Sequence, residues 1–115
     1  MKILGVHYIL DLFDCDPKIL DDLNFLKFEL ERAADIAGAH ILNTSAHKFH
    51  PQGVSVLVMV SESHLSIHTF PEVETATADI YTCGDINTEA AVNYIIKQLR
   101  CKRPSVIKLN RGVMI

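Results

Sequence analysis

The sequence predicts an α+β fold, a two-layer α/β sandwich in which a mainly antiparallel sheet carries two helices on one face. Short apolar and alternating segments are typical of strands, two stretches repeat apolar residues with the helical period, and polar turns join consecutive strands as hairpins. With 115 residues, 49% of them hydrophobic and 22% charged, the chain is expected to form one compact domain over residues 1–115.

The first strand is predicted over residues 2–13, which are rich in β-branched and aromatic side chains. A helix follows, with Asp16 as its N-cap, Pro17 at its first position and Gly38 at its C-terminal end. Its core side is predicted from apolar residues at steps of three and four: Ile19, Leu23, Leu26, Leu30, Ala33 and Ala37.

A second strand is predicted over residues 39–49 and a turn over residues 50–53. Residues 54–60 form a nearly continuous apolar run, typical of a central strand that is buried on both faces. The polar residues 61–64 then predict a hairpin-like reversal before another strand over residues 64–70.

Residues 71–74 interrupt the strand pattern, which resumes over residues 75–82 and ends at Cys83, Gly84 and Asp85. The last strand is predicted from Pro104 to about Arg111. A second helix is predicted between the strand over residues 75–82 and this last strand, and it begins near Asn87 and Thr88. The residues expected on its core side are Ala91, Ile95, Ile96 and Leu99.

The composition limits the kinds of binding partner and the cellular compartment that we expect for this protein. Eleven basic against fourteen acidic residues give a net charge of −3, and the longest basic stretch is residues 100–103, which argues against nucleic acid and favours a small-molecule partner. Cys15, Cys83 and Cys101 form no CxxC pair, so we expect neither a disulfide framework nor a zinc knuckle. With no signal-peptide core and no membrane-spanning run, we expect a cytoplasmic protein that does not bind membranes.

Hydroxyl, imidazole and carboxylate groups are concentrated in residues 61–72. A solvated sheet face explains any one of these groups, but their joint occurrence points to chemistry. On a strand, Leu65 and Ile67 would face the core, and the opposite face would carry the reactive set: His64, Ser66, His68 and Phe70.

Two further interpretations of these groups are weaker. A zinc site could draw on His47, His50, His64 and His68, but His64 and His68 would lie roughly 13 Å apart on a strand, so we expect no metal. A Ser-His-Asp hydrolase is disfavoured because Ser63 does not lie in a G-x-S-x-G motif.

Several segments along the chain together match the pattern of a known family: His7, residues 47–49 and 51–55, Ser61-Glu62-Ser63-His64-Leu65, Ile67-His68-Thr69-Phe70-Pro71-Glu72 and Thr82-Cys83-Gly84. In these segments, and along essentially its whole length, the chain resembles the short bacterial and archaeal class of S-adenosylmethionine decarboxylase proenzymes. The resemblance implies self-cleavage between Glu62 and Ser63 into a β chain, residues 1–62, and an α chain, residues 63–115, whose first residue becomes a pyruvoyl group made from Ser63.

The resemblance also implies residue roles. A serine held in a tight reversal can attack the preceding carbonyl, and the resulting ester then eliminates to leave the pyruvoyl group, which replaces an external cofactor. The implied roles are nucleophile for Ser63, acid–base group for His68, oxyanion donor for Ser55, proton donor for Cys83, and substrate binding for Glu72, Phe49 and Phe70.

The implied activity is decarboxylation of S-adenosylmethionine for polyamine synthesis. Val56 and residues 73–75 depart from the family pattern near the expected pocket, and Glu74 adds a carboxylate that suits a cationic side chain, so arginine or ornithine stays open as the substrate. A non-enzymatic ferredoxin-like binding domain is the alternative from a different class. We also expect a homodimer, because one sheet face has no helices to cover it, and the resemblance implies that Phe49 faces the partner's Ser63.

Overall fold

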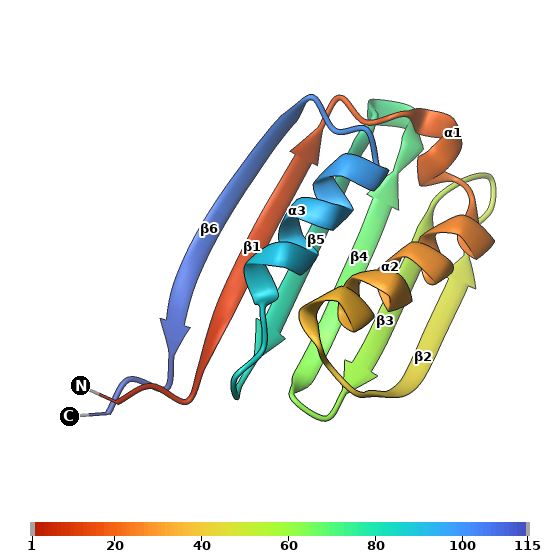
Figure 1. The fold of residues 1–115 in the computed structure, drawn as a ribbon. Coiled ribbons are helices and arrows are strands. Elements are labelled where there is room, and N and C mark those ends of the chain that lie inside the picture. The colour runs from red at the N-terminus through yellow and green to blue at the C-terminus, as the bar shows by residue number, and fades with distance from the viewer. Residues whose placement is uncertain (1, 115) are drawn as a thin grey trace.

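The computed structural model describes residues 2–114. Six strands form one sheet in the order β2-β3-β4-β5-β1-β6, and every neighbouring pair is antiparallel (Figure 1). The strands are β1 (Gly5–Phe13), β2 (Ile41–Lys48), β3 (Val54–Val60), β4 (Ser63–Phe70), β5 (Thr75–Thr82) and β6 (Arg103–Arg111).

The two long helices lie side by side on one face of this sheet (Figure 1), which confirms the predicted α+β sandwich. Apolar side chains of the strands and both helices form one core between the two layers. In residues 2–114 no helix is both long enough and apolar enough to cross a membrane. The helices are α1 (Pro17–Leu20), α2 (Leu23–Ala37) and α3 (Thr88–Gln98), with a 3-10 turn η1 (Pro71–Val73) between β4 and β5.

The single helix predicted after Asp16 is wrong, because the chain forms two. Asp16 caps α1 by accepting the Lys18 N–H, but Asp22 then caps a new helix by accepting the Phe25 N–H at 3.0 Å. Between the two helices, Asp21 accepts the N–H of Gly53 at 2.9 Å. The apolar spacing runs through this break, so periodicity alone did not reveal it.

Strand positions were predicted closely, with small shifts at the ends. The predicted strands 54–60 and 75–82 match β3 and β5, and β1 begins at Gly5 rather than at residue 2. The strand after the reversal begins at Ser63, one residue earlier than predicted. As expected, Leu65 and Ile67 are buried on the helix side.

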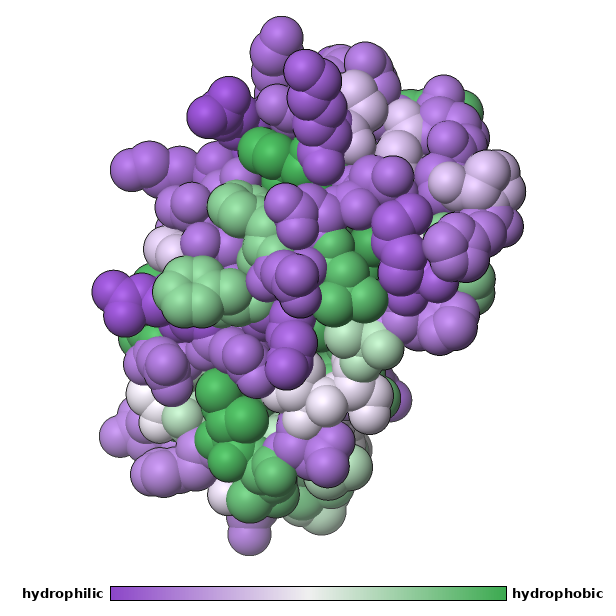
Figure 2. Space-filling view, turned by 90° about the vertical axis from the view of Figure 1, so that its right-hand side faces the viewer, coloured by the Kyte–Doolittle hydropathy of each residue, from purple (hydrophilic) through white to green (hydrophobic). Residues whose placement is uncertain are grey.

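The prediction that residues 54–60 are buried on both faces is wrong for the protomer. Val54, Val56 and Val58 are buried under the helices, but Leu57 and Met59, on the opposite face, are 45% and 51% exposed. We call this opposite side of the sheet the open face. Figure 2 views the β2 edge and shows hydrophobic side chains exposed among polar ones. Other exposed apolar residues of the open face are Ile107, Leu109 and Phe70.

Candidate active site

The predicted site residues lie near the two ends of β4. Ser63 begins β4 and pairs with Thr82 of β5, whereas His68 pairs with Ser55 of β3 near the other end of the strand. Five residue steps separate Ser63 from His68, which corresponds to about 17 Å at roughly 3.4 Å per residue. One protomer therefore does not bring the expected nucleophile next to its expected acid–base group.

The first end is the β3–β4 turn, which carries the Glu62–Ser63 peptide bond. The carbonyl oxygen of Glu62 accepts hydrogen bonds from the backbone N–H of Cys83 at 2.9 Å and from the Cys83 thiol at 3.3 Å. Two donors on one carbonyl oxygen stabilise the negative charge that a nucleophile attacking the carbon would create. Ser63 has a φ of +143°, a backbone angle that serine rarely adopts.

The second end is a cavity of about 570 Å³ next to the β2–β3 turn. Ser55 and His68 line it and contact each other, with Oγ 2.8 Å from Nδ1. Phe49, Phe70 and Glu72 line the same cavity, and both aromatic rings are partly exposed. The structure thus groups the expected substrate-binding residues with Ser55 and His68, away from the cleavage turn.

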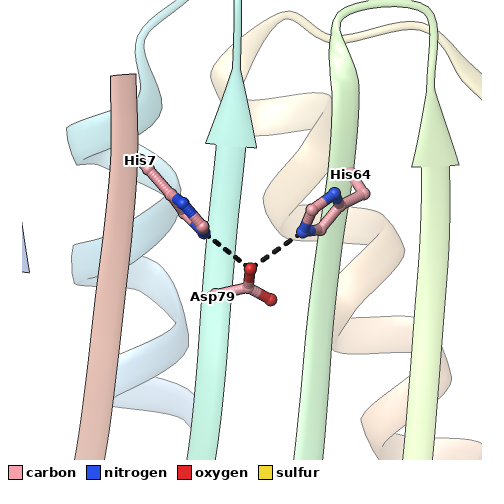
Figure 3. Close-up of side chains that lie close together, drawn as sticks. All are labelled: His7, His64 and Asp79. Atoms are coloured by element: carbon pink, nitrogen blue, oxygen red, sulfur yellow. Dashed lines mark hydrogen bonds and ion pairs between the residues drawn. The ribbon is translucent and has the colours of Figure 1, made fainter. Parts of the chain in front are cut away.

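A hydrogen-bonded network lies on the open face between these two ends (Figure 3). Asp79 of β5 contacts the Nε2 atoms of His7 and His64 through Oδ2, at 2.7 and 2.8 Å, and accepts a hydrogen bond from Ser66 through Oδ1. The guanidinium of Arg111 lies 2.7 Å from Nδ1 of His7. The network joins β6, β1, β5 and β4 across the sheet.

Asp79 is held as a carboxylate. Burial raises the pKa of Asp79, but hydrogen bonds from Ser66, His64 and His7 outweigh burial and leave the pKa below its usual value. The charged form is therefore the one that this part of the sheet stabilises.

The chemistry of the ring nitrogens favours hydrogen bonding over metal binding at this network. Among the described residues, His7, His64 and Asp79 are close enough to share an ion, and His47, His50 and His68 lie outside this group. A guanidinium can only donate, so Nδ1 of His7 accepts from Arg111 and its Nε2 carries the hydrogen that faces Asp79. A metal ion would need a lone pair at that same Nε2, where this arrangement places a hydrogen. His7, His64 and Asp79 as arranged therefore do not fit a metal ion.

Sequence reasoning gave no role to two residues that contact the site. Asp79 could have been found, because alternation puts it on the same face as Tyr81 and acidic residues are uncommon inside strands. His40, which binds the Glu62 side chain, gave no sequence signal, since 22 residues separate the two partners. His7 was part of the family resemblance, but its contact with Asp79 emerges only from the pairing of β1 with β5.

Comparison with known proteins identifies the family of the chain. The family model for S-adenosylmethionine decarboxylase matches residues 6–112. A protein named S-adenosylmethionine decarboxylase proenzyme 2 from Bacillus cereus is 48% identical over 110 residues, covering 95% of this chain and 89% of that protein. The S-adenosylmethionine decarboxylase proenzyme of Thermodesulfovibrio yellowstonii is 44% identical over 115 residues, covering 99% and 85%.

The fold matches a solved structure equally well. The crystal structure of the adenosylmethionine decarboxylase from Aquifex aeolicus superimposes with a TM-score of 0.92 at 37% sequence identity, covering 100% of this chain and 96% of that one. Family model, relatives and fold agree over nearly the whole chain. The chain therefore belongs to the S-adenosylmethionine decarboxylase family.

Proposed function

We propose that this protein is a self-processing, pyruvoyl-dependent decarboxylase of S-adenosylmethionine. In this proposal the single domain of residues 1–115 cleaves itself into residues 1–62 and 63–115, and Ser63 becomes the pyruvoyl group. The observation that carries the proposal is the cleavage turn, where Cys83 donates twice to the Glu62 carbonyl next to a Ser63 with a φ of +143°. The names of the relatives support the substrate.

Self-cleavage consumes one water molecule and needs no other reactant. The Ser63 Oγ attacks the carbonyl carbon of Glu62, the C–N bond breaks, and the hydroxyl proton ends on the Ser63 nitrogen, giving an ester. Loss of the Ser63 Cα proton then expels the Glu62 carboxylate and leaves dehydroalanine, whose imine form adds water and releases ammonia. The Cys83 N–H and thiol stabilise the oxyanion in the first step, because both already bind that oxygen.

The remaining processing residues come from a second copy of the chain in this proposal. Ser55 and His68 hydrogen bond to each other but lie about 17 Å along the sheet from Ser63 of the same protomer. A homodimer whose open faces pack together, with the two sheets related by a twofold axis, can bring this pair to Ser63 of the partner subunit. The exposed apolar residues of the open face, Leu57, Met59, Ile107 and Leu109, support this arrangement.

In the processed enzyme, a pyruvoyl group supplies an electrophilic carbonyl and an electron sink for loss of carbon dioxide from an amino acid. The chain must then protonate the substrate carbon. Cys83 is suited to this role because its thiol is exposed at the end of β5 and contacts the residue preceding Ser63.

The cavity around Phe49 favours a nucleoside substrate over a simple cationic amino acid. Two partly exposed rings, Phe49 and Phe70, offer stacking surfaces for adenine, and Glu72 offers an acceptor for ribose hydroxyls. Glu74, the carboxylate that could have favoured arginine or ornithine, lines a different concavity with Cys15 and Asp16. This separation, together with the names of the relatives, is our reason for preferring S-adenosylmethionine.

Mass spectrometry of the purified protein tests the processing, and carbon dioxide release tests the substrate. We expect two fragments divided after Glu62, the second with a blocked N-terminus, and release from S-adenosylmethionine but not from arginine or ornithine. An intact chain with a free Ser63 after prolonged incubation would favour the non-enzymatic binding domain. Release from arginine or ornithine alone would replace the substrate and keep the mechanism.

The state of the thiols supports a proposal for the cellular compartment. All three cysteines are free, and none is placed in a disulfide. We propose a reducing compartment, the cytoplasm, where the Cys83 thiol would remain available for chemistry.

A further inference from the structure

His40 holds the side chain of the residue whose peptide bond is to be cleaved. Its backbone N–H donates to Oε1 of Glu62 and its ring Nδ1 lies against Oε2, both at 3.0 Å. The carbonyl oxygen of His40 accepts the N–H of Ser61 at 2.9 Å. Three groups of one residue therefore bind the two residues that precede Ser63.

His40 follows directly on the closed end of a helix. His40 lies two residues after Gly38, which ends α2 in the left-handed conformation with a φ of +86°. The N–H of Ala39 returns to the carbonyl of Ala34 at 3.0 Å, which closes the helix end, and Ala39 itself is buried. The backbone that leads to His40 is thus anchored in the core at the end of α2.

Glu62 is held at its main chain as well as at its side chain. Cys83 binds its carbonyl oxygen, while His40 binds its carboxylate, so the acyl half of the Glu62–Ser63 bond is fixed at both ends. Fixing both ends matters because the attack of a hydroxyl on a carbonyl depends steeply on the relative position of the two groups. Hydrogen bonds from the His40 side chain and backbone also lower the pKa of Glu62, which keeps the carboxylate charged.

We propose that His40 is a positioning residue for self-cleavage, acting through the Glu62 carboxylate to hold the carbonyl at the Cys83 donors. This inference rests on the proposed cleavage between Glu62 and Ser63. We assign His40 an orienting role and not proton transfer, because its contacts with Glu62 run through the backbone N–H and Nδ1 to the carboxylate, not to Ser63 or to the carbonyl that is attacked.

Three substitutions of His40 separate positioning from folding. The ring is largely exposed, at 78%, so removing it leaves the core intact. In His40→Asn, an amide nitrogen can take the place of Nδ1 and keep the donor. His40→Ala removes the side-chain donor and keeps the backbone N–H, whereas His40→Asp places a second carboxylate against Glu62.

The experiment follows the decay of freshly made, intact chain by mass spectrometry. We expect His40→Ala to cleave about two- to fivefold more slowly than the parent protein, the range for one exposed charged contact. His40→Asn should cleave at the parent rate and His40→Asp more slowly than His40→Ala. Once cleaved, all three should release carbon dioxide at the parent rate per pyruvoyl group. His50→Ala, which alters another exposed histidine, is the control and should match the parent.

Each other outcome counts against the proposal. Equal cleavage of His40→Ala and the parent would show that the contact does not position the bond. A His40→Asn variant as slow as His40→Ala, or a loss of turnover that parallels the loss of cleavage, would show that the ring acts in some other way. If the parent protein fails to cleave, the proposed function fails first, so the two failures are distinguishable.

Discussion

Cys83 offers two separable groups at the cleavage turn. Its backbone N–H is retained in any substitution except proline, whereas its thiol is specific to cysteine. Self-cleavage draws on both groups as donors to one oxygen, but protonation of the substrate carbon needs the thiol. Substitution of this residue therefore affects the two stages of the proposed reaction to different extents.

For Cys83→Ala we expect cleavage to slow by roughly tenfold, because the stronger of the two oxyanion donors remains. Turnover per pyruvoyl group should fall by about 10²- to 10⁴-fold, the contribution of a positioned acid. Mass spectrometry measures the first and carbon dioxide release the second. Cys101→Ala, which removes a thiol that contacts the Phe13 carbonyl elsewhere, should leave both rates unchanged. Equal losses in both steps for Cys83→Ala would contradict the separation of roles.

Glu72→Gln should weaken substrate binding without slowing self-cleavage. Glu72 lines the cavity with Phe49 and Phe70, and the proposed self-cleavage gives it neither a proton to move nor a hydrogen bond to the Glu62 carbonyl. Loss of a charged acceptor for ribose hydroxyls costs about 1.5–3 kcal/mol, so KM for S-adenosylmethionine should rise roughly tenfold to a hundredfold. Steady-state kinetics on fully cleaved protein gives this value. A block in cleavage would show that Glu72 belongs to the processing machinery.

Asp79 makes stability depend on pH in a defined direction. Its pKa is lowered in the folded state, so the unfolded chain takes up a proton at higher pH than the folded one. The stability contributed by Asp79 is complete above the unfolded value of about 3.9 and is lost as pH falls toward the lower folded value. Asp79→Asn should lower the free energy of unfolding at pH 7 by about 1–3 kcal/mol. The variant should also lose less stability than the parent protein when the pH is lowered.

Urea unfolding at pH 7 and below pH 4 measures the Asp79 effect. Asp35→Asn, on the exposed side of α2, is the matched control and should retain the stability of the parent at pH 7. If Asp79→Asn lost as much stability as the parent on acidification, the carboxylate would not be the group that titrates.

At the scale of elements, the spacing of apolar residues and the positions of turn residues predicted nearly every helix and strand. They succeeded where local chemistry and long-range packing agree, as in β5, which alternates buried and half-buried residues along its length. They failed at Asp21 and Asp22, where a continuous apolar stripe hides a break. The break depends on Asp21 reaching Gly53, a contact between residues far apart in the sequence.

The α2 cap gives a test at this scale. Asp22 accepts the Phe25 N–H at 3.0 Å and begins the longest helix of the protein. Asp22→Ala should therefore lower the free energy of unfolding by about 0.5–2 kcal/mol, and Asp22→Asn, which retains a capping oxygen, should retain most of it. Denaturant unfolding measures the free energy of unfolding of both variants. An equal decrease in both would mean that the charge of Asp22, and not its capping hydrogen bond, stabilises α2.

At the scale of the whole molecule, the residues of the candidate site were predicted, but their arrangement was not. The resemblance named Ser63 and His68 as partners, whereas five steps along one strand place them about 17 Å apart. The same strand geometry that argued against a His64–His68 metal site applies to this pair. The resemblance implied that Phe49 faces the partner's Ser63, but the sequence did not say which copy of the chain supplies Ser55 and His68, because that depends on how two open faces meet.

Mixed dimers test whether the site is shared between subunits. One chain carries Ser63→Ala and keeps His68, while the other carries His68→Ala and keeps Ser63, and the two bear different tags. Each variant alone should remain intact.

When they are produced together, the mixed dimer pairs Ser63 of the second chain with His68 of the first, so we expect the His68→Ala chain to be cleaved and the Ser63→Ala chain to stay whole. Mass spectrometry of protein purified through both tags reads out the two chains separately. A His68→Ala chain that stays intact in the mixed dimer, or that cleaves when produced alone, would contradict a site completed by the partner subunit.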